Sequence, residues 1–342
     1  MHSILPSSPD LERLADLLGR SLARVEERIK AQLASELPPV QALSRQVERY
    51  HGKMVRPMVA MLSGLAVDAS ASVEPDEAHV SEEHVVVAAV CEMVHLATLV
   101  HDDVLDEAEV RRQGPTINSL HGNESAVILG DYLFSAAFNL CAGLDAQAVS
   151  MLIARVGMTL CEGELLQLHH RGNFSLDERT YFAIVRRKTA SLIAASCRLG
   201  ARFGGADEAT QARLETLGEA LGIAFQVQDD LLDLTGEQSV VGKSLGKDLE
   251  KGKLTLPIIH HLASATPEQR ARTLLLLEGA PAGHEGTAAL RRALESTGSV
   301  AHARRTAERY VAAAKEAIAP LHESVAKTML MQLADAIVTR AY

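Results

Sequence analysis

The sequence predicts an all-α fold, and three observations carry this prediction. Ala and Leu dominate the apolar residues, aromatic residues make up only 3% of the chain, and Trp is absent. Such a composition favours helix over strand. Apolar residues recur at helical spacing, and no segment alternates as a half-buried strand would. Because 47% of the 342 residues are hydrophobic, the chain can form a large core. We expect a single-domain helical bundle over residues 1–342.

The N-terminal third contains two predicted helices before a polar loop. Asp10 is a candidate N-cap for a helix with apolar residues at helical spacing from 11 to 33. Pro38-Pro39 then breaks this helix. A second apolar run covers about 57–67. Residues 68–82, which are rich in Asp, Ser and Glu, are predicted to form a surface loop.

Further predicted helices alternate with loops along the rest of the chain. A long apolar helix is expected over about 83–107, and residues 114–116 mark a turn. Residues 242–252 form a loop rich in Gly and Lys, and residues 279–286 form another connection. The other predicted helices cover about 117–142, 147–170, 178–203, 208–235, 256–264, 268–277, 287–296, 301–317 and 321–341.

Charge and cysteine content limit the classes of function. The formal net charge of −10 argues against nucleic-acid binding, because such surfaces usually carry a basic excess. The four cysteines form no CxxC pair and lie in apolar surroundings, which predicts buried, reduced thiols. The first residues lack the pattern of a signal peptide, and no apolar stretch reaches the roughly 20 residues that cross a bilayer. We expect a cytoplasmic protein without stable membrane insertion.

Two acidic motifs of the form DDxxD each follow an apolar run. Their aspartates are Asp102, Asp103 and Asp106 in the first motif and Asp229, Asp230 and Asp233 in the second. Residues four apart on a helix share one face, with Cβ atoms roughly 5–6 Å apart. Two carboxylates this close repel each other unless a cation lies between them. Oxygen-only ligands suit Mg²⁺, so the sequence predicts paired magnesium-binding motifs at the rim of a cavity.

Cationic residues accompany these motifs, as a site for diphosphates would require. Arg binds phosphate oxygens through its planar fork, and Lys supplies a point charge. His95 precedes Asp102 by seven residues and shares its helical face, and Gln226 precedes Asp229 by three. The remaining candidates are Lys53, Arg56, Arg111, Arg112, Lys188 with Thr189, Lys243, Lys247 and Lys253.

With these residues the chain resembles the polyprenyl synthetases, the trans-isoprenyl diphosphate synthases. The resemblance covers about residues 45–265. It is carried by the two acidic motifs and by Gly52-Lys53 with Arg56-Pro57, Glu92-Met-Val-His95, Arg111-Arg112, Gly130-Asp131-Tyr132, Glu162-Gly163-Glu164-Leu-Leu-Gln167, Lys188-Thr189-Ala190, Phe225-Gln226 and Gly242-Lys243. It implies a class I isoprenoid synthase fold, which is a helical bundle around a deep central cavity.

The resemblance also implies a role for each residue. The six aspartates would hold about three Mg²⁺ ions and, with Lys188, would be catalytic. Isopentenyl diphosphate would be bound by Lys53, Arg56, His95 and Arg112. The allylic diphosphate would be bound by Arg111, Lys188, Thr189, Gln226, Lys243 and Lys253. Three departures from the family pattern are His51 in place of Gly, Met54 in place of Arg, and the additional Lys247, to which we assign no role.

The reaction implied is the condensation of isopentenyl diphosphate with an allylic diphosphate to give a longer all-trans chain. Magnesium and the cations would stabilise the departing diphosphate. The double bond of isopentenyl diphosphate would then attack the allylic cation, and the departing diphosphate would take the proton. A homodimer is implied as well, with the apolar helices at 117–142 and 147–170 as candidates for its interface.

Product length is predicted from the residues just before the first motif. Ala97 and Thr98 are small where short-chain members of the family carry aromatic residues. Ala97 lies about 7 Å below Asp102 along a helix, which leaves room for a growing tail. We therefore expect products of about C30 or longer. Phe134 and Phe138 are candidates for the floor of the cavity, with ordinary core packing as the alternative.

Other functions compete with this prediction. A farnesyl or geranylgeranyl diphosphate synthase would share the chemistry and make a shorter product. A class I terpene cyclase would carry a second metal motif of Asn/Ser/Glu type and an aromatic-rich pocket, and this chain has neither in its sequence. A non-catalytic partner subunit usually lacks one or both acidic motifs. A helical metal-binding scaffold would not explain the ordered cations.

Overall fold

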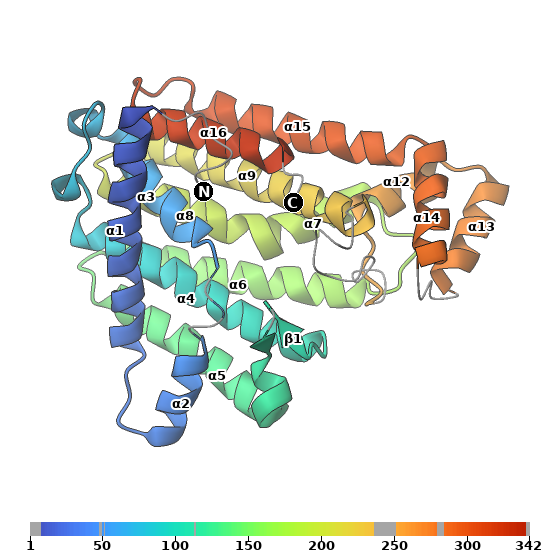
Figure 1. Ribbon diagram of the computed structural model, residues 1–342, viewed down its shortest axis with the longest axis horizontal. Helices are drawn as coiled ribbons and strands as arrows, with labels where there is room; N and C mark the ends of the chain where they lie inside the picture. The colour runs from blue at the N-terminus through green and yellow to red at the C-terminus, as the bar shows by residue number, and fades with distance from the viewer. Residues whose placement is uncertain are drawn as a thin grey trace. The chain divides into compact units, whose positions relative to one another are not determined.

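The computed structural model describes residues 8–47, 50, 52–112, 114–235, 251–278 and 284–339. Helices make up most of these ranges (Figure 1), which confirms the all-α prediction. The strands β1 (Val110–Arg111) and β2 (Gly114–Pro115) form a short antiparallel hairpin between two long helices.

The described helices follow the predicted order closely. They are α1 (Pro9–Gln32), α2 (Pro38–Val47), α3 (Val55–Val67), α4 (Glu82–Leu105), α5 (Ile117–Ala142), α6 (Gln147–His169), α7 (Glu178–Val185), α8 (Ser191–Phe203), α9 (Glu208–Thr235), α12 (Leu256–Ser264), α13 (Pro267–Glu278), α14 (His284–Ser296), α15 (Ser299–Ile318) and α16 (Val325–Thr339). Single-turn 3-10 helices η2 (Ala69–Ala71) and η3 (Glu77–His79) lie within the predicted 68–82 loop.

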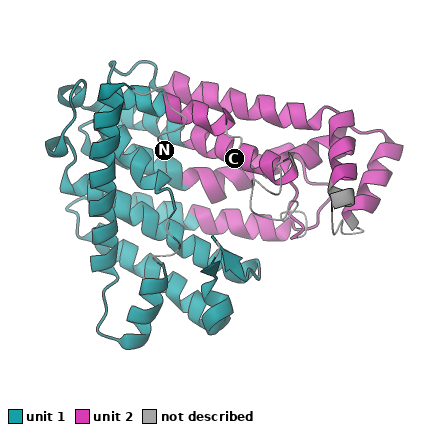
Figure 2. Ribbon diagram, viewed as in Figure 1, with its two compact units in different colours: residues 1–158, 192–218, 318–331 teal, residues 159–191, 219–317, 332–342 magenta. Residues whose placement is uncertain are grey.

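The chain divides into two compact units (Figure 2). Unit 1 comprises residues 1–158, 192–218 and 318–331, and unit 2 comprises residues 159–191, 219–317 and 332–342. The first acidic motif belongs to unit 1 and the second to unit 2. The expectation of one domain around a deep central cavity stays a prediction.

Helix α4 is the core helix of unit 1 and carries the first acidic motif at its end. Ser81 caps its N-terminus by accepting a hydrogen bond from the backbone N–H of His84. By length and composition, α4 and α5 could each cross a membrane, but a buried core helix passes the same test, so the expectation of no membrane insertion stays a prediction. In α4, 78% of the most apolar window is buried, which is typical of a core helix. In α5 the buried share is 39%.

Two local predictions are corrected by the structure. Helix α1 already ends at Gln32, so Pro38 does not break it. Pro38 instead begins α2, because the first turn of a helix needs no partner for the N–H that proline lacks. The expected continuous helix over 178–203 is interrupted by a π-helical turn, η4 (Arg186–Ala190), between α7 and α8. π-turns occur often at functional sites, and this one contains two predicted binding residues.

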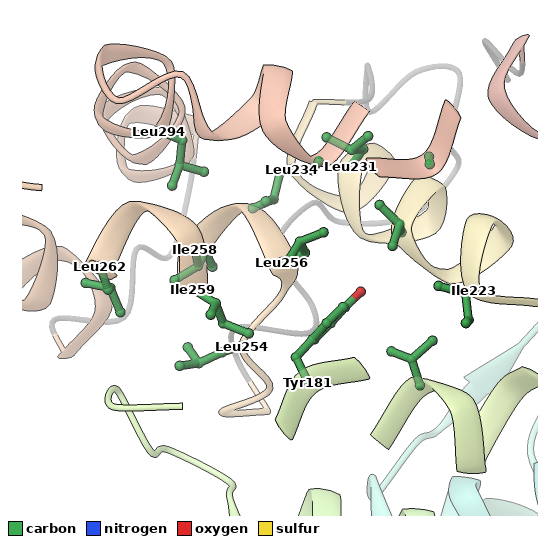
Figure 3. Close-up of a cluster of buried hydrophobic side chains, with 14 of the residues drawn as sticks. Tyr181, Ile223, Leu231, Leu234, Leu254, Leu256, Ile258, Ile259, Leu262 and Leu294 are labelled. Atoms are coloured by element: carbon green, nitrogen blue, oxygen red, sulfur yellow. The ribbon is translucent and has the colours of Figure 1, made fainter. Parts of the chain in front are cut away.

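A hydrophobic cluster in unit 2 supports the second acidic motif (Figure 3). It contains Tyr181 of α7, Leu231 and Leu234 of α9, and Leu256 and Ile259 of α12, all of them buried. These side chains join three helices that are far apart in the sequence. The cluster therefore fixes the part of α9 that carries the motif.

The cysteines differ in exposure. Cys91, Cys141 and Cys197 are buried and unpaired, as expected. Cys161 is exposed on α6, so the prediction of buried thiols was wrong at this position. Burial raises the pKa of Cys91 to about 12, which keeps this thiol protonated and inert at neutral pH.

Candidate active site

The first acidic motif lies at the C-terminal end of α4. Asp102 and Asp106 are partly exposed, and Asp106 occupies the C-cap position. The backbone N–H of Asp106 donates to the carbonyl oxygen of Asp102 over 2.8 Å, so helical spacing is kept between the two residues. The outer aspartates of the motif thus lie four residues apart on a helix, as the sequence predicts.

The middle aspartate, Asp103, is buried with only 1% of its surface exposed. Its carboxylate accepts hydrogen bonds from the hydroxyl of Tyr50 at 2.8 Å and from Nε of Arg111 at 2.9 Å. Nη2 of Arg111 adds a third contact at 2.6 Å. Burial and Asp103 raise the pKa of the Tyr50 hydroxyl, which therefore remains a donor. Asp103 thus anchors the end of α4 to Tyr50 and Arg111.

The β1–β2 hairpin positions the two arginines that follow the motif. Arg111 pairs with Gly114 in the hairpin register. Arg112 has a φ of 49°, in the left-handed region, and one of its guanidinium nitrogens donates to the carbonyl oxygen of Tyr50. A Cβ placed on Gly52 would lie 2.7 Å from Cζ of Arg112. The glycine of the Gly52-Lys53 pair therefore leaves room for the guanidinium of Arg112.

If Arg112 binds isopentenyl diphosphate, as the family resemblance implies, replacing Gly52 with Ala should raise the KM for this substrate roughly tenfold. The added methyl group would displace the guanidinium of Arg112 and weaken a charge-assisted contact worth about 1.5–3 kcal/mol. Steady-state kinetics with varied isopentenyl diphosphate would measure this. Gly19→Ala is the matched control, since a Cβ there meets no atom within 4 Å. An unchanged KM in Gly52→Ala would show that Arg112 does not contribute to binding isopentenyl diphosphate.

Arg56, Glu92, His95 and Arg112 form a cluster of charged and polar residues in unit 1. Glu92 is 3% exposed, and burial raises its pKa while Arg56 and Arg112 oppose that rise. Burial and three neighbouring arginines hold the pKa of His95 well below its ordinary value. His95 is therefore neutral at pH 7, so it can act as a hydrogen-bond partner rather than as a cation.

Two polar atoms of this cluster are buried without a hydrogen-bond partner in the described part of the chain. They are Nε of Arg56 and Oε2 of Glu92. Buried polar atoms are almost always paired in folded proteins, and exceptions are frequent at functional sites. The orphaned Nε of Arg56 indicates a place where an anionic ligand would supply the missing acceptor.

Met54, which stands where the family pattern has Arg, lies in the segment before α3. Lys53 is exposed, whereas Met54 is 5% exposed and has a φ of 50° at the N-cap of α3. An arginine at this position, which the family resemblance would suggest, would have to place its charge where Met54 is buried. Lys53 and Arg56 remain as the cations of the segment.

The second acidic motif lies near the C-terminal end of α9 in unit 2. Asp229 is exposed, Asp233 is partly exposed, and Asp230 is buried with 2% of its surface exposed. Asp230 accepts hydrogen bonds from the hydroxyl of Tyr181 at 2.6 Å, from Nε2 of Gln226 at 3.0 Å and from the backbone N–H of Leu256 at 3.2 Å. As in the first motif, a tyrosine hydroxyl holds the buried middle aspartate.

The π-turn contains Lys188 and Thr189 and is packed closely against α6 and α9. Nζ of Lys188 donates to Oε1 of Gln167 at 2.9 Å and forms an ion pair with Glu164. The hydroxyl of Thr189 donates to Oε1 of Gln226 at 3.1 Å. Thr189 and Gln226 thus form one hydrogen-bonded network with Asp230, while the neighbouring Lys188 contacts Gln167 and Glu164 of α6. The role of these residues in binding a diphosphate stays a prediction.

A glycine of α6 permits this close approach. A Cβ placed on Gly163 would lie 2.7 Å from the backbone nitrogen of Lys188 and 2.8 Å from Cβ of Arg187. The Glu162-Gly163-Glu164-Leu-Leu-Gln167 motif therefore combines a glycine for packing with two partners for Lys188. The sequence predicted the motif but not these roles.

The predicted chain-length residues lie on α4 and α5 of unit 1. Ala97 is fully buried, and the hydroxyl of Thr98 donates to the carbonyl oxygen of His95 at 2.7 Å. Phe134 stacks on Phe138 with ring centroids 6.4 Å apart, and on His101, which precedes the first motif, at 6.2 Å. A column of rings therefore begins beside the motif. Its function as a cavity floor stays a prediction.

Some predicted residues lie outside the part of the chain that the structure describes. These are His51, Lys243 and Lys247. Lys253 is described and partly exposed, and the adjacent Gly252 accepts a hydrogen bond from the backbone N–H of Gly172 at 2.8 Å. Sequence analysis assigned no role to Tyr50, Tyr181, Glu92, Glu164 or Gln167. Of these five residues, Glu92, Glu164 and Gln167 belong to motifs that the sequence analysis recognised.

Comparisons with known proteins identify the family of this chain. The sequence profile of the family described as Polyprenyl synthetase matches residues 38–294. The chain belongs to the polyprenyl synthetase family. It is 33% identical to heptaprenyl diphosphate synthase component 2 of Geobacillus stearothermophilus, with 97% of this chain and 99% of the relative covered. It is 32% identical to octaprenyl diphosphate synthase of Escherichia coli, with the same coverage of each chain.

A solved structure in the polyprenyl synthetase family extends the likeness to three dimensions. The chain matches polyprenyl synthase from Caulobacter crescentus with a TM-score of 0.85 and 29% identity, covering 99% of this chain and 100% of that one. That protein was crystallised with calcium and isoprenyl diphosphate. The prediction of a prenyltransferase with the all-α class I isoprenoid fold is confirmed.

Proposed function

We propose that this polyprenyl synthetase condenses isopentenyl diphosphate with an allylic diphosphate of the farnesyl or geranylgeranyl type, giving an all-trans product of about C30 or longer. The observation that carries the proposal lies in unit 1. There, Asp102 and Asp106 end the same helix that contains Glu92 and His95, beside the orphaned Nε of Arg56. Unit 1 thus contains both carboxylates that can bind a metal ion and a cation that can bind a diphosphate.

The donor set of the motifs fits Mg²⁺. Asp102 and Asp106 in unit 1, and Asp229 and Asp233 in unit 2, offer carboxylate oxygens at helical spacing and partial or full exposure. Asp103 and Asp230 instead hold their helices through Tyr50 and Tyr181. We assign about three ions to the site. Magnesium bound there would act as a Lewis acid on the departing diphosphate.

The other side chains of the site bind the two substrates and exclude water. Lys53, Arg56 and Arg112 bind isopentenyl diphosphate, and neutral His95 supplies a hydrogen bond to it. Lys188 and Thr189 of the π-turn, together with Gln226, bind the allylic diphosphate. The buried apolar wall of α4 keeps water from the allylic cation. Arg111 serves mainly to hold Asp103 in place.

The proposed activity is tested by incubating the purified protein with farnesyl diphosphate, labelled isopentenyl diphosphate and Mg²⁺, with EDTA as the control. Magnesium-dependent labelled products of about C30 or longer are expected. Labelled products that stop at C20 would keep the chemistry and overturn the predicted product length. An unlabelled cyclic hydrocarbon formed from farnesyl diphosphate alone would favour a terpene cyclase. The absence of product with any primer would point to a missing partner subunit.

Replacing Ala97 with Phe is expected to shorten the product by one or more isoprene units. Ala97 is fully buried about 7 Å below Asp102 along α4, where an aromatic ring would obstruct the growing tail. Chromatography of the dephosphorylated products measures the change. Ala314→Phe, equally buried on α15 in unit 2, controls for overpacking, which costs about 1–3 kcal/mol. An unchanged distribution of product lengths in Ala97→Phe would show that Ala97 does not control product length.

We also assign a homodimer and a cytoplasmic location to the protein. Helix α5 leaves Val127 41% and Ile128 67% exposed, and α6 leaves Met158 67% exposed, which is unusual for large apolar residues on a solvated surface. Sedimentation should give the mass of two chains, and Ile128→Glu should shift it to one. A single-chain mass for the wild type would contradict this, and a larger complex in cells would indicate a heteromer.

A further inference from the structure

Three potential metal ligands meet in unit 2, outside the proposed diphosphate site. They are Glu178, the first residue of α7, His260 of α12 and His302 of α15. One ligand atom from each residue lies within 4.8 Å of the other two. None of these residues belongs to a motif that the sequence analysis recognised. We propose that Glu178, His260 and His302 form a second metal site, for a divalent transition-metal ion of the zinc type.

The chemistry of the donors decides the class of ion. Two imidazole nitrogens and one carboxylate oxygen suit Zn²⁺ and its neighbours in the first transition row, whereas Mg²⁺ prefers oxygen ligands throughout. Three protein ligands also leave a fourth position for water. The site therefore differs in metal preference from the two acidic motifs.

The surrounding hydrogen bonds orient one of the ligands. Nδ1 of His260 lies 2.9 Å from the hydroxyl oxygen of Ser299, which leaves Nε2 as the nitrogen available for a metal. The hydroxyl oxygen of Thr297 lies 2.7 Å from that of Ser299 and 2.8 Å from Nδ1 of His261. A polar partner on the second ring nitrogen is the usual way in which proteins fix a metal-binding histidine.

The other ligands are close together and partly exposed. Nε2 of His302 lies 3.0 Å from Oε1 of Glu178, yet it is buried and has no partner in hydrogen-bond geometry within the described residues. The side chains of His302 and Glu178 are 29% and 36% exposed, but Nε2 of His302 is itself buried, so this imidazole has to turn before an ion can reach it. Burial, His302 and Arg305 lower the pKa of His260 against the effect of Glu178, which favours the neutral, metal-binding imidazole.

The two rings are stacked, with centroids 4.0 Å apart and an interplanar angle of 19°. Nearly parallel rings do not point both nitrogens at one position, so coordination requires the imidazoles to turn about their side-chain bonds. The ion would join α7, α12 and α15. Because Glu178 precedes Tyr181 by three residues, and Tyr181 donates to Asp230, the ion would also stabilise the helix that anchors the second acidic motif.

The test uses the full-length, untagged protein with excess Mg²⁺, so that the acidic motifs are occupied by magnesium. Zn²⁺ is titrated against a chromophoric chelator, and Co²⁺ is used as a spectroscopic probe. Wild type should bind about one equivalent of Zn²⁺ more than His302→Ala or His260→Ala, with roughly a 100-fold loss of affinity in the variants. The visible absorption bands of four-coordinate Co²⁺ should appear in the wild type only.

Two further variants complete the design. His121→Ala, an exposed histidine of α5 in unit 1, is the matched control and should bind zinc as the wild type does. Glu178→Gln keeps the size of the side chain and replaces the histidine variants if circular dichroism shows that they do not fold. Equal zinc stoichiometry in wild type and folded variants, or only the weak bands of six-coordinate Co²⁺, would overturn the proposal.

Discussion

Replacing Asp102 with Asn should lower kcat by roughly 10²–10³-fold at fixed Mg²⁺, the range typical for removing one group that stabilises charge in the transition state. The substitution keeps the size and the helical position of the side chain but removes the charge that would bind the cation. The Mg²⁺ concentration for half-maximal activity should rise in parallel. Steady-state kinetics over a range of Mg²⁺ concentrations measures both effects.

Two comparisons make this result specific. Asp16→Asn, on the exposed face of α1, should leave kcat and the magnesium dependence unchanged. Asp103→Asn should act mainly on stability, because the buried carboxylate pairs with Arg111 and Tyr50. If Asp102→Asn retained wild-type activity at low Mg²⁺, the first motif could not be the metal site that we propose.

Replacing Arg56 with Met should lower the free energy of unfolding by about 2–3 kcal/mol, somewhat below the 3–5 kcal/mol typical of a broken buried pair. The substitution leaves the carboxylate of Glu92 buried with less compensation, and only Arg112 continues to oppose the rise of its pKa. Urea unfolding followed by circular dichroism measures the loss. The KM for isopentenyl diphosphate should rise as well, since we assign Arg56 to binding this substrate.

A double-mutant cycle separates the two effects. Adding Glu92→Gln to Arg56→Met removes the uncompensated charge and should recover most of the stability. It should not recover the KM for isopentenyl diphosphate, because the guanidinium is still absent. If the stability loss of the double variant equals the sum of the losses in Arg56→Met and Glu92→Gln, Arg56 and Glu92 are not coupled.

Periodicity predicted the helices well because long apolar stripes dominate this chain. The acidic motifs could be located because helical spacing alone places Asp102 beside Asp106 and Asp229 beside Asp233. The π-turn at Arg186–Ala190 could not be predicted, since one additional residue in a turn leaves the apolar pattern almost unchanged. The left-handed conformations of Met54 and Arg112 likewise carry no signal in residue type.

The anchors of the motifs were missed for a different reason. Tyr50 and Tyr181 contact aspartates 53 and 49 residues away, and only tertiary structure creates such pairs. Spacing also treats the three aspartates of a motif alike, although burial separates the middle one from the outer two. Spacing alone therefore gave Asp103 and Asp230 the same metal-binding role as the outer aspartates, whereas the structure shows each of them bonded to a tyrosine.

The tyrosine–aspartate pairs give the two motifs a modular construction. In each, a helix end presents two outer carboxylates while its central one is secured by a phenol about fifty residues earlier in the chain. The two anchors bind different aspartates and belong to different units. A substitution at one tyrosine can therefore change how one acidic motif is held, while the other motif keeps its own tyrosine.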